Sequence, residues 1–305
     1  MSFKDALNSG RFVVTAEAGP PKGTDISKIV HEVEALKGKV DAVNVTDNQS
    51  AVMRISSTSF CKILIDMGIE PILQMTCRDR NRIGLQSDLL GASILGIRNV
   101  LCMTGDHPNA GDHKEAKPVY DIESVQLLGV IDALNNGKDM MGNDLQGSTD
   151  YLQGAVVTPE ANPLEPQLMK FKKKVNVGAK FFQTQAVYNI DNFKSFMGHA
   201  RKYPVHPVRK DAGYNGVKIL AGLVLLKSAG MANFMNKFVP GIIVPQELID
   251  ELKAAGKEKA LDTGIDIMAS HIKQLKAENV CDGVHIMAIG AEDKVPAIME
   301  RAGLL

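Results

Sequence analysis

Residues 70–104 read EPILQMTCRDRNRIGLQSDLLGASILGIRNVLCMT. The stretch opens and closes with a short apolar run, at residues 70–76 and 98–104, and neither run alternates strictly between apolar and polar side chains. This pattern is typical of strands that are buried on both faces. Residues 80–95, between the two runs, carry apolar side chains at helical spacing. The stretch therefore predicts a strand–helix–strand unit.

The same unit recurs along the whole chain. Eight short apolar runs predict strands, at residues 11–17, 41–46, 70–76, 98–104, 154–158, 180–185, 217–223 and 283–289. Helical patterns occupy residues 25–36, 50–67, 80–95, 121–134, 164–177, 189–201 and 245–277, the last with a break near Gly256. Eight alternating strands and helices fit a closed barrel or a doubly wound open sheet. The strand count favours a single (β/α)8 TIM barrel, and no GxGxxG follows a predicted strand, which counts against a Rossmann domain.

The length of the chain fits one such barrel. The chain has 305 residues, and a barrel of this kind takes about 250 plus insertions. No linker or internal repeat divides the sequence, so we expect one catalytic domain over residues 1–305. A long loop insertion follows the fourth strand, between residues 106 and 153. Loops of this length after a barrel strand are more often functional than decorative.

Composition excludes several function classes. The chain is 45% hydrophobic and carries 35 basic and 35 acidic residues, so no net charge draws it to nucleic acid or to an anionic membrane. No apolar run reaches the roughly 18 residues that a membrane span needs, and the first residues do not resemble a signal peptide. The four cysteines are far apart and form no CxxC pair. We therefore expect a cytoplasmic protein with reduced thiols.

Polar residues recur where the predicted strands end. In a (β/α)8 barrel these ends converge at the catalytic face. Polar residues commonly begin loops, so any one of these positions has a purely structural explanation, but this explanation is weaker for the whole set. The set includes Glu17, Thr46, Gln74, Thr104, Asp106, Thr158, Glu160 and Gln185.

Two carboxylates stand out in this set. Glu17 ends an apolar strand, where loss of hydration favours the protonated form, so it could act as a general acid. The alternative is a solvated or salt-bridged loop glutamate. Asp106 follows Thr104 and Gly105 at the start of the long loop, where it could hydrogen-bond a polar heterocycle or stabilise a cation. The alternative there is an Asx-type turn residue.

A basic cluster lies on the predicted helix after the fifth strand. Lys170 and Lys174 belong to it, and such a cluster is usually a solvated face, although one lysine could serve a cofactor phosphate. The seven histidines show no metal-ligand spacing with a nearby carboxylate, so no metal site is predicted.

Five short motifs together resemble one family. They are AEAGPPK at residues 16–22, VNVTD at 43–47, MTCRD at 75–79, TGD at 104–106 and GAKFFQTQ at 178–185. With GVHI at 283–286, their order from about residue 10 to the C-terminus resembles that of the methylenetetrahydrofolate reductases. Each motif is weak alone, but their shared order is specific.

The resemblance implies a flavoprotein barrel that converts 5,10-methylenetetrahydrofolate to 5-methyltetrahydrofolate. It makes Glu17 the general acid for ring opening, places Asp106 between flavin and pterin, and gives Gln185 a substrate contact. It implies FAD, with FMN left open, because the sequence itself does not distinguish them. The residues expected around the cofactor are Thr46, Gln74, Thr104, Gly105, Asp106, Thr158, Glu160, Lys170 and Lys174, with Lys174 at the phosphates and Thr46 at the reactive edge of the flavin.

The chain departs from the family pattern where the reductant would bind. Thr104 stands in place of a flavin-facing arginine, Ala186 and Val187 replace aromatic residues, and residues 225–230 lack a phenylalanine. Our hypothesis is that a partner redox protein or subunit, in a homo- or hetero-oligomer, supplies the electrons instead of NAD(P)H. The chain has no cysteine cluster for an iron–sulfur centre, so such a relay would lie elsewhere.

Two other readings stay open on the sequence. A pterin-binding methyltransferase barrel would bind the same folate without flavin, and a non-catalytic subunit of a larger complex would need neither. Colour separates them from the reductase reading, because a purified flavoprotein is yellow.

Overall fold

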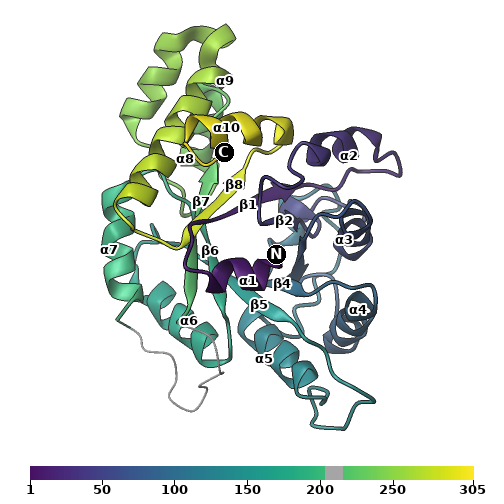
Figure 1. The fold of residues 1–305 in the computed structure, drawn as a ribbon. Coiled ribbons are helices and arrows are strands. Elements are labelled where there is room, and N and C mark those ends of the chain that lie inside the picture. Colours follow the sequence, from purple (N-terminus) through teal and green to yellow (C-terminus); the bar gives the residue numbers. More distant parts are fainter. Residues whose placement is uncertain (203–215) are drawn as a thin grey trace.

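The computed structural model describes residues 1–202 and 216–305. Eight parallel strands close into a barrel in sequence order, and helices surround it (Figure 1). The strands are β1 (Val13–Ala18), β2 (Ala42–Val45), β3 (Pro71–Thr76), β4 (Asn99–Met103), β5 (Leu152–Val157), β6 (Phe181–Ala186), β7 (Lys218–Val224) and β8 (Gly283–Met287). The predicted (β/α)8 barrel is therefore confirmed.

Helices follow the strands as the periodicity predicts. They are α2 (Ser27–Glu34), α3 (Ser57–Asp66), α4 (Arg82–Ile94), α5 (Ser124–Asn135), α6 (Glu165–Asn176), α7 (Ile190–Ala200), α8 (Ala229–Phe238), α9 (Gln246–Ala277) and α10 (Val295–Arg301). The predicted break in α9 is confirmed, since Gly256 has a left-handed φ of 73°. Neither α8 nor α10 was predicted.

Glycine allows the barrel to close between its first and last strands. Gly283 of β8 pairs with Val13 of β1, and a Cβ atom at Gly283 would lie 2.0 Å from the Val13 carbonyl oxygen. Any side chain there would push the two strands apart. The pairing of β6 with β7 is irregular between Gln183 and Ala186, and such irregularities redirect side chains at barrel rims. Gln185 lies inside this irregular segment.

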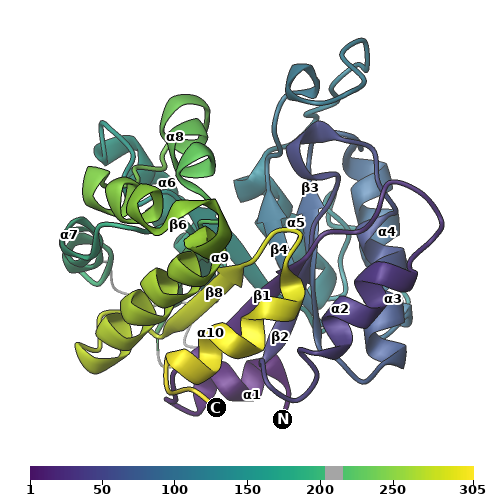
Figure 2. The same ribbon diagram turned by 90° about the horizontal axis from the view of Figure 1, so that it is seen from above.

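A short N-terminal helix, α1 (Phe3–Asn8), closes one end of the barrel. It lies across the strands in Figure 1, and Figure 2 shows it at the same end as both termini. A capping box between Ser2 and Asp5 begins the helix. Its apolar residues pack on inward-facing residues of the strands, and the Phe3 ring meets the Phe181 ring edge-on at 5.1 Å. Helix α1 therefore fills the amino-terminal end of the barrel.

Phe3→Ala should destabilise the fold more than any surface change. Phe3 is fully buried, and removing a buried phenylalanine ring costs about 3–5 kcal/mol, which corresponds to a fall in Tm of roughly 5–15 °C. Phe234→Ala is the matched control, because Phe234 is 57% exposed. Thermal unfolding of both variants measures this, and equal Tm values would contradict a sealing role for α1.

The helix predicted for residues 50–67 is wrong at its start. Left-handed φ values of 47°, 56° and 57° occur at Asn48, Ser50 and Ala51, and the last two lie inside the predicted range. This left-handed backbone cannot continue into a helix. A 3-10 turn, η1 (Gln49–Ala51), therefore follows β2, and α3 begins only at Ser57.

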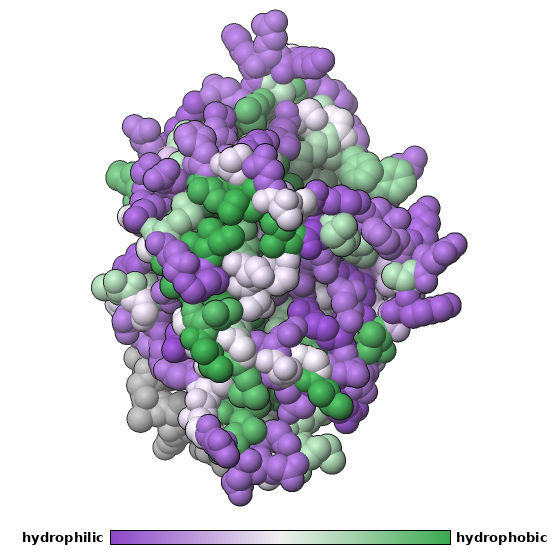
Figure 3. Space-filling view, turned by 90° about the vertical axis from the view of Figure 1, so that its right-hand side faces the viewer, coloured by the Kyte–Doolittle hydropathy of each residue, from purple (hydrophilic) through white to green (hydrophobic). Residues whose placement is uncertain are grey.

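The side formed by α2, α3 and α4 mixes polar and apolar surface (Figure 3). The outward face of α4 carries Ile83 and Ile94, which are 73% and 86% exposed. These side chains contribute nothing to the barrel core. The expected association with other chains stays a prediction.

Candidate active site

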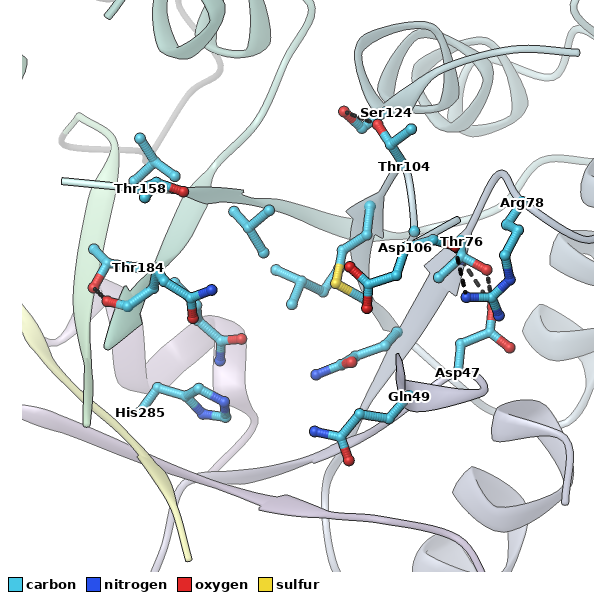
Figure 4. Close-up of a pocket in the computed structure, with 18 of the residues that line it drawn as sticks. Asp47, Gln49, Thr76, Arg78, Thr104, Asp106, Ser124, Thr158, Thr184 and His285 are labelled. Carbon is cyan, nitrogen blue, oxygen red and sulfur yellow. Dashed lines mark hydrogen bonds between the residues drawn. The ribbon is translucent and has the colours of Figure 1, made fainter. Parts of the chain in front are cut away.

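One pocket of about 430 Å³ opens at the carboxyl ends of the strands. Figure 4 shows Arg78, Thr76 and Asp47 on one side of it, His285 and Thr184 on the other, and Asp106 pointing toward the centre. Most of the predicted site residues line this pocket. They are Glu17, Gln74, Thr104, Gly105, Asp106, Thr158, Lys170, Lys174 and Gln185.

Glu17 lies in the wall of the pocket, near the end of β1. Its side chain is buried, and both carboxylate oxygens are engaged. Gln49 Nε2 donates to Oε1 at 3.3 Å, and Gln74 Nε2 donates to Oε2 at 3.0 Å. His285 Nε2 of β8 lies 3.6 Å from the same Oε2 atom. Three side chains from different strands and loops therefore fix the direction in which this carboxyl faces.

A buried polar layer lies beneath Glu17 and holds His285. The His285 Nδ1 atom lies 3.0 Å from the Thr15 hydroxyl. Gln183 Nε2 donates to that hydroxyl at 3.2 Å and to Asn44 Oδ1 at 3.0 Å, and Asn44 Nδ2 donates back to Gln183 Oε1 at 2.6 Å. The layer joins β1, β2, β6 and β8 across the barrel. Since unpaired polar groups would be costly there, the layer fixes the ring orientation of His285.

Asp106 points into the pocket from the loop after β4, and a tight turn at Gly105 precedes it (Figure 4). Gly105 has a φ of 92°, and a Cβ atom there would lie 3.0 Å from Thr76 Cβ. The Gly105 carbonyl accepts a hydrogen bond from the Tyr120 hydroxyl at 3.2 Å. The Asp106 side chain is exposed to solvent.

Lys174 is a buried cation in the floor of the pocket. Its amine donates to the Val156 carbonyl at 2.6 Å. Burial, with a contribution from nearby Lys170, lowers the pKa of Lys174 to about 8. Lys170 itself forms an ion pair with Glu123 at 2.9 Å. Within residues 1–202 and 216–305, no carboxylate lies within ion-pair distance of the Lys174 amine. An anionic ligand group would supply the missing charge.

Two predicted residues do not line the pocket. The Thr46 hydroxyl is buried and has no hydrogen-bond partner in the described part of the chain. Glu160 is also buried, and Asn192 Nδ2 donates to its carboxylate at 3.4 Å. Burial raises the pKa of Glu160. The cofactor contacts expected of Thr46 and Glu160 stay predictions.

Sequence reasoning missed several residues that build the pocket. Asp47 accepts hydrogen bonds from the Thr76 amide at 2.8 Å and hydroxyl at 2.9 Å, and it forms an ion pair with Arg80. Asp47 directly follows a predicted strand, so its position was a usable signal. Arg78 and His285 lie within the MTCRD and GVHI motifs, but their roles depend on contacts between distant segments, which the motifs do not reveal.

Comparisons with known proteins point to one family. Residues 2–303 match the profile of the family "Methylenetetrahydrofolate reductase". The 5,10-methylenetetrahydrofolate reductase of Escherichia coli is 24% identical over 318 residues, covering 99% of this chain and 97% of that protein. A probable methylenetetrahydrofolate reductase (NADPH) of Caenorhabditis elegans is 23% identical over 258 residues, covering 82% of this chain.

Some relatives are much longer than this chain. The match covers only 35% of the Caenorhabditis elegans protein and 36% of methylenetetrahydrofolate reductase 2 of Schizosaccharomyces pombe. Among solved structures, an uncharacterized Clostridium thermocellum protein that binds two copies of 5-methyl-5,6,7,8-tetrahydrofolic acid superposes with a TM-score of 0.65. It is 17% identical, and the match covers 99% of this chain and 98% of that one, so the likeness shows a common fold.

The described residues contain neither a helix suited to a membrane nor a cluster of metal ligands. None of the helices in the described ranges is both long and apolar enough to cross a membrane. No three His, Cys, Asp or Glu side chains within those ranges are grouped so that they could hold a metal ion.

Proposed function

This chain belongs to the methylenetetrahydrofolate reductase family, and we propose that it reduces 5,10-methylenetetrahydrofolate to 5-methyltetrahydrofolate with a bound flavin. The observation that carries this proposal is a pair of carboxylates in one pocket with opposite environments. Glu17 is buried and held by side-chain amides, whereas Asp106 is exposed at the pocket opening. Such a pair can separate an acid role from an electrostatic role.

The pocket residues fit a flavin nucleotide. Lys174 offers a buried amine without an anionic partner in the described residues, which suits a phosphate group. The other residues that line this pocket and are expected at the cofactor are Thr158, Lys170, Gln74, Thr104 and Gly105. We infer FAD from the family resemblance. The bound flavin would supply the hydride, and the chain supplies orientation, a proton and fixed charge.

Glu17 would supply the proton that opens the bridging five-membered ring of the folate. Its two amide contacts aim the carboxyl, and the nearby His285 ring limits where it can move. Ring opening leaves a cationic iminium on the folate. The negative charge of Asp106 would stabilise that cation, because charges interact strongly in a site from which the substrate excludes water. Gln185 would hydrogen-bond the folate.

The electron donor would be a redox partner rather than a nicotinamide nucleotide. No phenylalanine, tyrosine or tryptophan lines the described pocket, so none of these side chains can stack on a nicotinamide ring there. The loop after β7 begins with Leu225 and Leu226, both of which are buried in the fold. Lys227, the next residue, donates to the Ile289 carbonyl at 2.7 Å.

Anaerobic spectroscopy of the purified protein tests the proposal. We expect a flavin spectrum that bleaches when 5-methyltetrahydrofolate is added to the oxidised protein. A separate sample mixed with NADH or NADPH should bleach slowly or not at all. Rapid bleaching by either nucleotide would contradict the partner donor. A colourless protein that flavin does not reconstitute would remove the reductase proposal and favour a flavin-free methyltransferase or a non-catalytic subunit.

A further inference from the structure

Arg78 is a buried guanidinium at the junction of three loops. It lies two residues after the end of β3, lines the pocket and is only 2% exposed. Its Nε and Nη2 atoms donate to the two carboxylate oxygens of Asp79 at 2.8 and 2.7 Å. This bidentate pair raises the pKa of Arg78, so the group stays charged despite its burial. Burying a charge in this way is costly, which calls for a functional explanation.

One contact reaches the loop that holds Glu17. Arg78 Nη2 donates to the Asn48 carbonyl at 3.2 Å. Asn48 has a left-handed φ of 47°, and such backbone costs free energy unless its surroundings hold it. The next residue is Gln49, whose amide donates to Glu17 Oε1 at 3.3 Å. Arg78 therefore fixes the backbone from which the Gln49 side chain reaches the acid.

A second contact reaches the loop that carries Asp106. Arg78 Nη1 donates to the Asp106 main-chain carbonyl at 3.3 Å. The turn before it is packed tightly on the same side chain, since a Cβ atom at Gly105 would lie 3.2 Å from Arg78 Cβ. One guanidinium thus bonds the loops after β2 and β4 from a position after β3.

We propose that Arg78 is a positioning residue that sets the placement of both pocket carboxylates at once. It acts on Glu17 through Asn48 and Gln49, and on Asp106 through that residue's own backbone. Its catalytic consequence rests on the proposed reductase function. Because a misplacement of about 1 Å can slow catalysis about 100-fold, one clamp that serves two groups should have a large effect on turnover and a small effect on folate binding.

Arg78→Lys tests the clamp, and Arg82→Lys is the matched control. Arg82 also forms a bidentate pair, with Asp121 at 2.8 and 2.9 Å, but lies outside the pocket. Hydrogen exchange should rise in residues 46–52 and 104–107 of Arg78→Lys and stay at the wild-type rate in Arg82→Lys. This measurement needs no activity. Unchanged exchange in Arg78→Lys would overturn the clamp.

Single-turnover kinetics test its consequence. Photoreduced protein is mixed with 5,10-methylenetetrahydrofolate, so the identity of the natural electron donor does not matter. Arg78→Lys should slow flavin reoxidation about 100-fold, while the folate concentration for half-maximal rate changes less than about threefold. Arg82→Lys should match the wild type. A loss confined to folate affinity would overturn the positioning role, whereas an unreactive wild type would overturn the proposed function itself.

A double variant tests the route through Gln49. Gln49→Ala should slow flavin reoxidation about tenfold in the wild-type background. In the Arg78→Lys background it should slow the reaction less than about threefold, because residues in one network have non-additive effects. Equal costs in both backgrounds would show that Arg78 does not act through Gln49. Arg78→Met repeats the comparison without a charge, if the variant folds with a wild-type Tm.

Discussion

Glu17→Gln should slow the reoxidation of reduced flavin by 5,10-methylenetetrahydrofolate by about 10²–10⁴-fold, the usual contribution of a general acid. The glutamine keeps the size of the side chain and can still meet Gln49 and Gln74, but it has no carboxyl proton to deliver. The rate of flavin reduction by 5-methyltetrahydrofolate, the reverse reaction, should fall less. Hydride leaves 5-methyltetrahydrofolate before the ring closes, so bleaching of the oxidised flavin should persist. Stopped-flow absorbance in both directions measures the difference.

Glu292→Gln is the control for that experiment. Glu292 is also a buried carboxyl, and its Oε1 atom accepts the Gly290 amide at 3.1 Å. It does not line the pocket. Its substitution should leave the forward rate within about twofold of the wild type. If both variants lost the same activity, the loss would come from barrel packing. A Glu17→Gln protein with the wild-type forward rate would contradict the acid role.

The strands were predictable because their burial is a local property of the sequence. In β3 and β4, runs with little alternation between apolar and polar residues signal strands that are covered on both faces. The polar residues that end such runs were predictable for the same reason. Glu17 and Gln74 lie near the ends of β1 and β3, and Asp106 follows β4. Parallel topology brings all of these strand ends to one face.

Contacts between distant segments were not predictable in this way. The position of His285 beside Glu17 requires β8 to lie beside β1, which only barrel closure brings about. The left-handed backbone around Ala51 is another case. Gly111, sixty residues later in the chain, packs so closely that a Cβ atom there would lie 1.8 Å from the Ala51 carbonyl oxygen. Neither loop contains a local sequence pattern that predicts this contact.

Helix α1 was missed because its stability comes from its place in the fold. Six residues are too few for a helix to be stable alone. The helix forms because Phe3 and Leu7 fill the barrel end beside Phe181. Sequence periodicity reveals long amphipathic helices, whereas a six-residue helix is too short to show a periodic pattern.

Lys174→Met should yield protein that purifies with little flavin and binds added flavin at least about tenfold more weakly, because it loses a charge-assisted contact to phosphate. Methionine keeps the volume and apolar stem of the lysine. Lys173→Met is the matched control, since Lys173 lies next to it on α6 and is exposed. Flavin content and fluorescence titration measure both variants, and wild-type flavin affinity in Lys174→Met would contradict the phosphate role.

Flavin affinity should fall as the pH rises above the pKa of Lys174. Burial lowers the pKa of Lys174 to about 8 in the free protein. Below that pH the amine is charged and ready for an anion. Above it, flavin binding must take up a proton, so affinity should fall by up to about tenfold per pH unit. In Lys174→Met this loss between pH 8 and 9 should disappear, whereas Lys173→Met should keep it. The same slope in Lys174→Met as in the wild type would show that another group titrates.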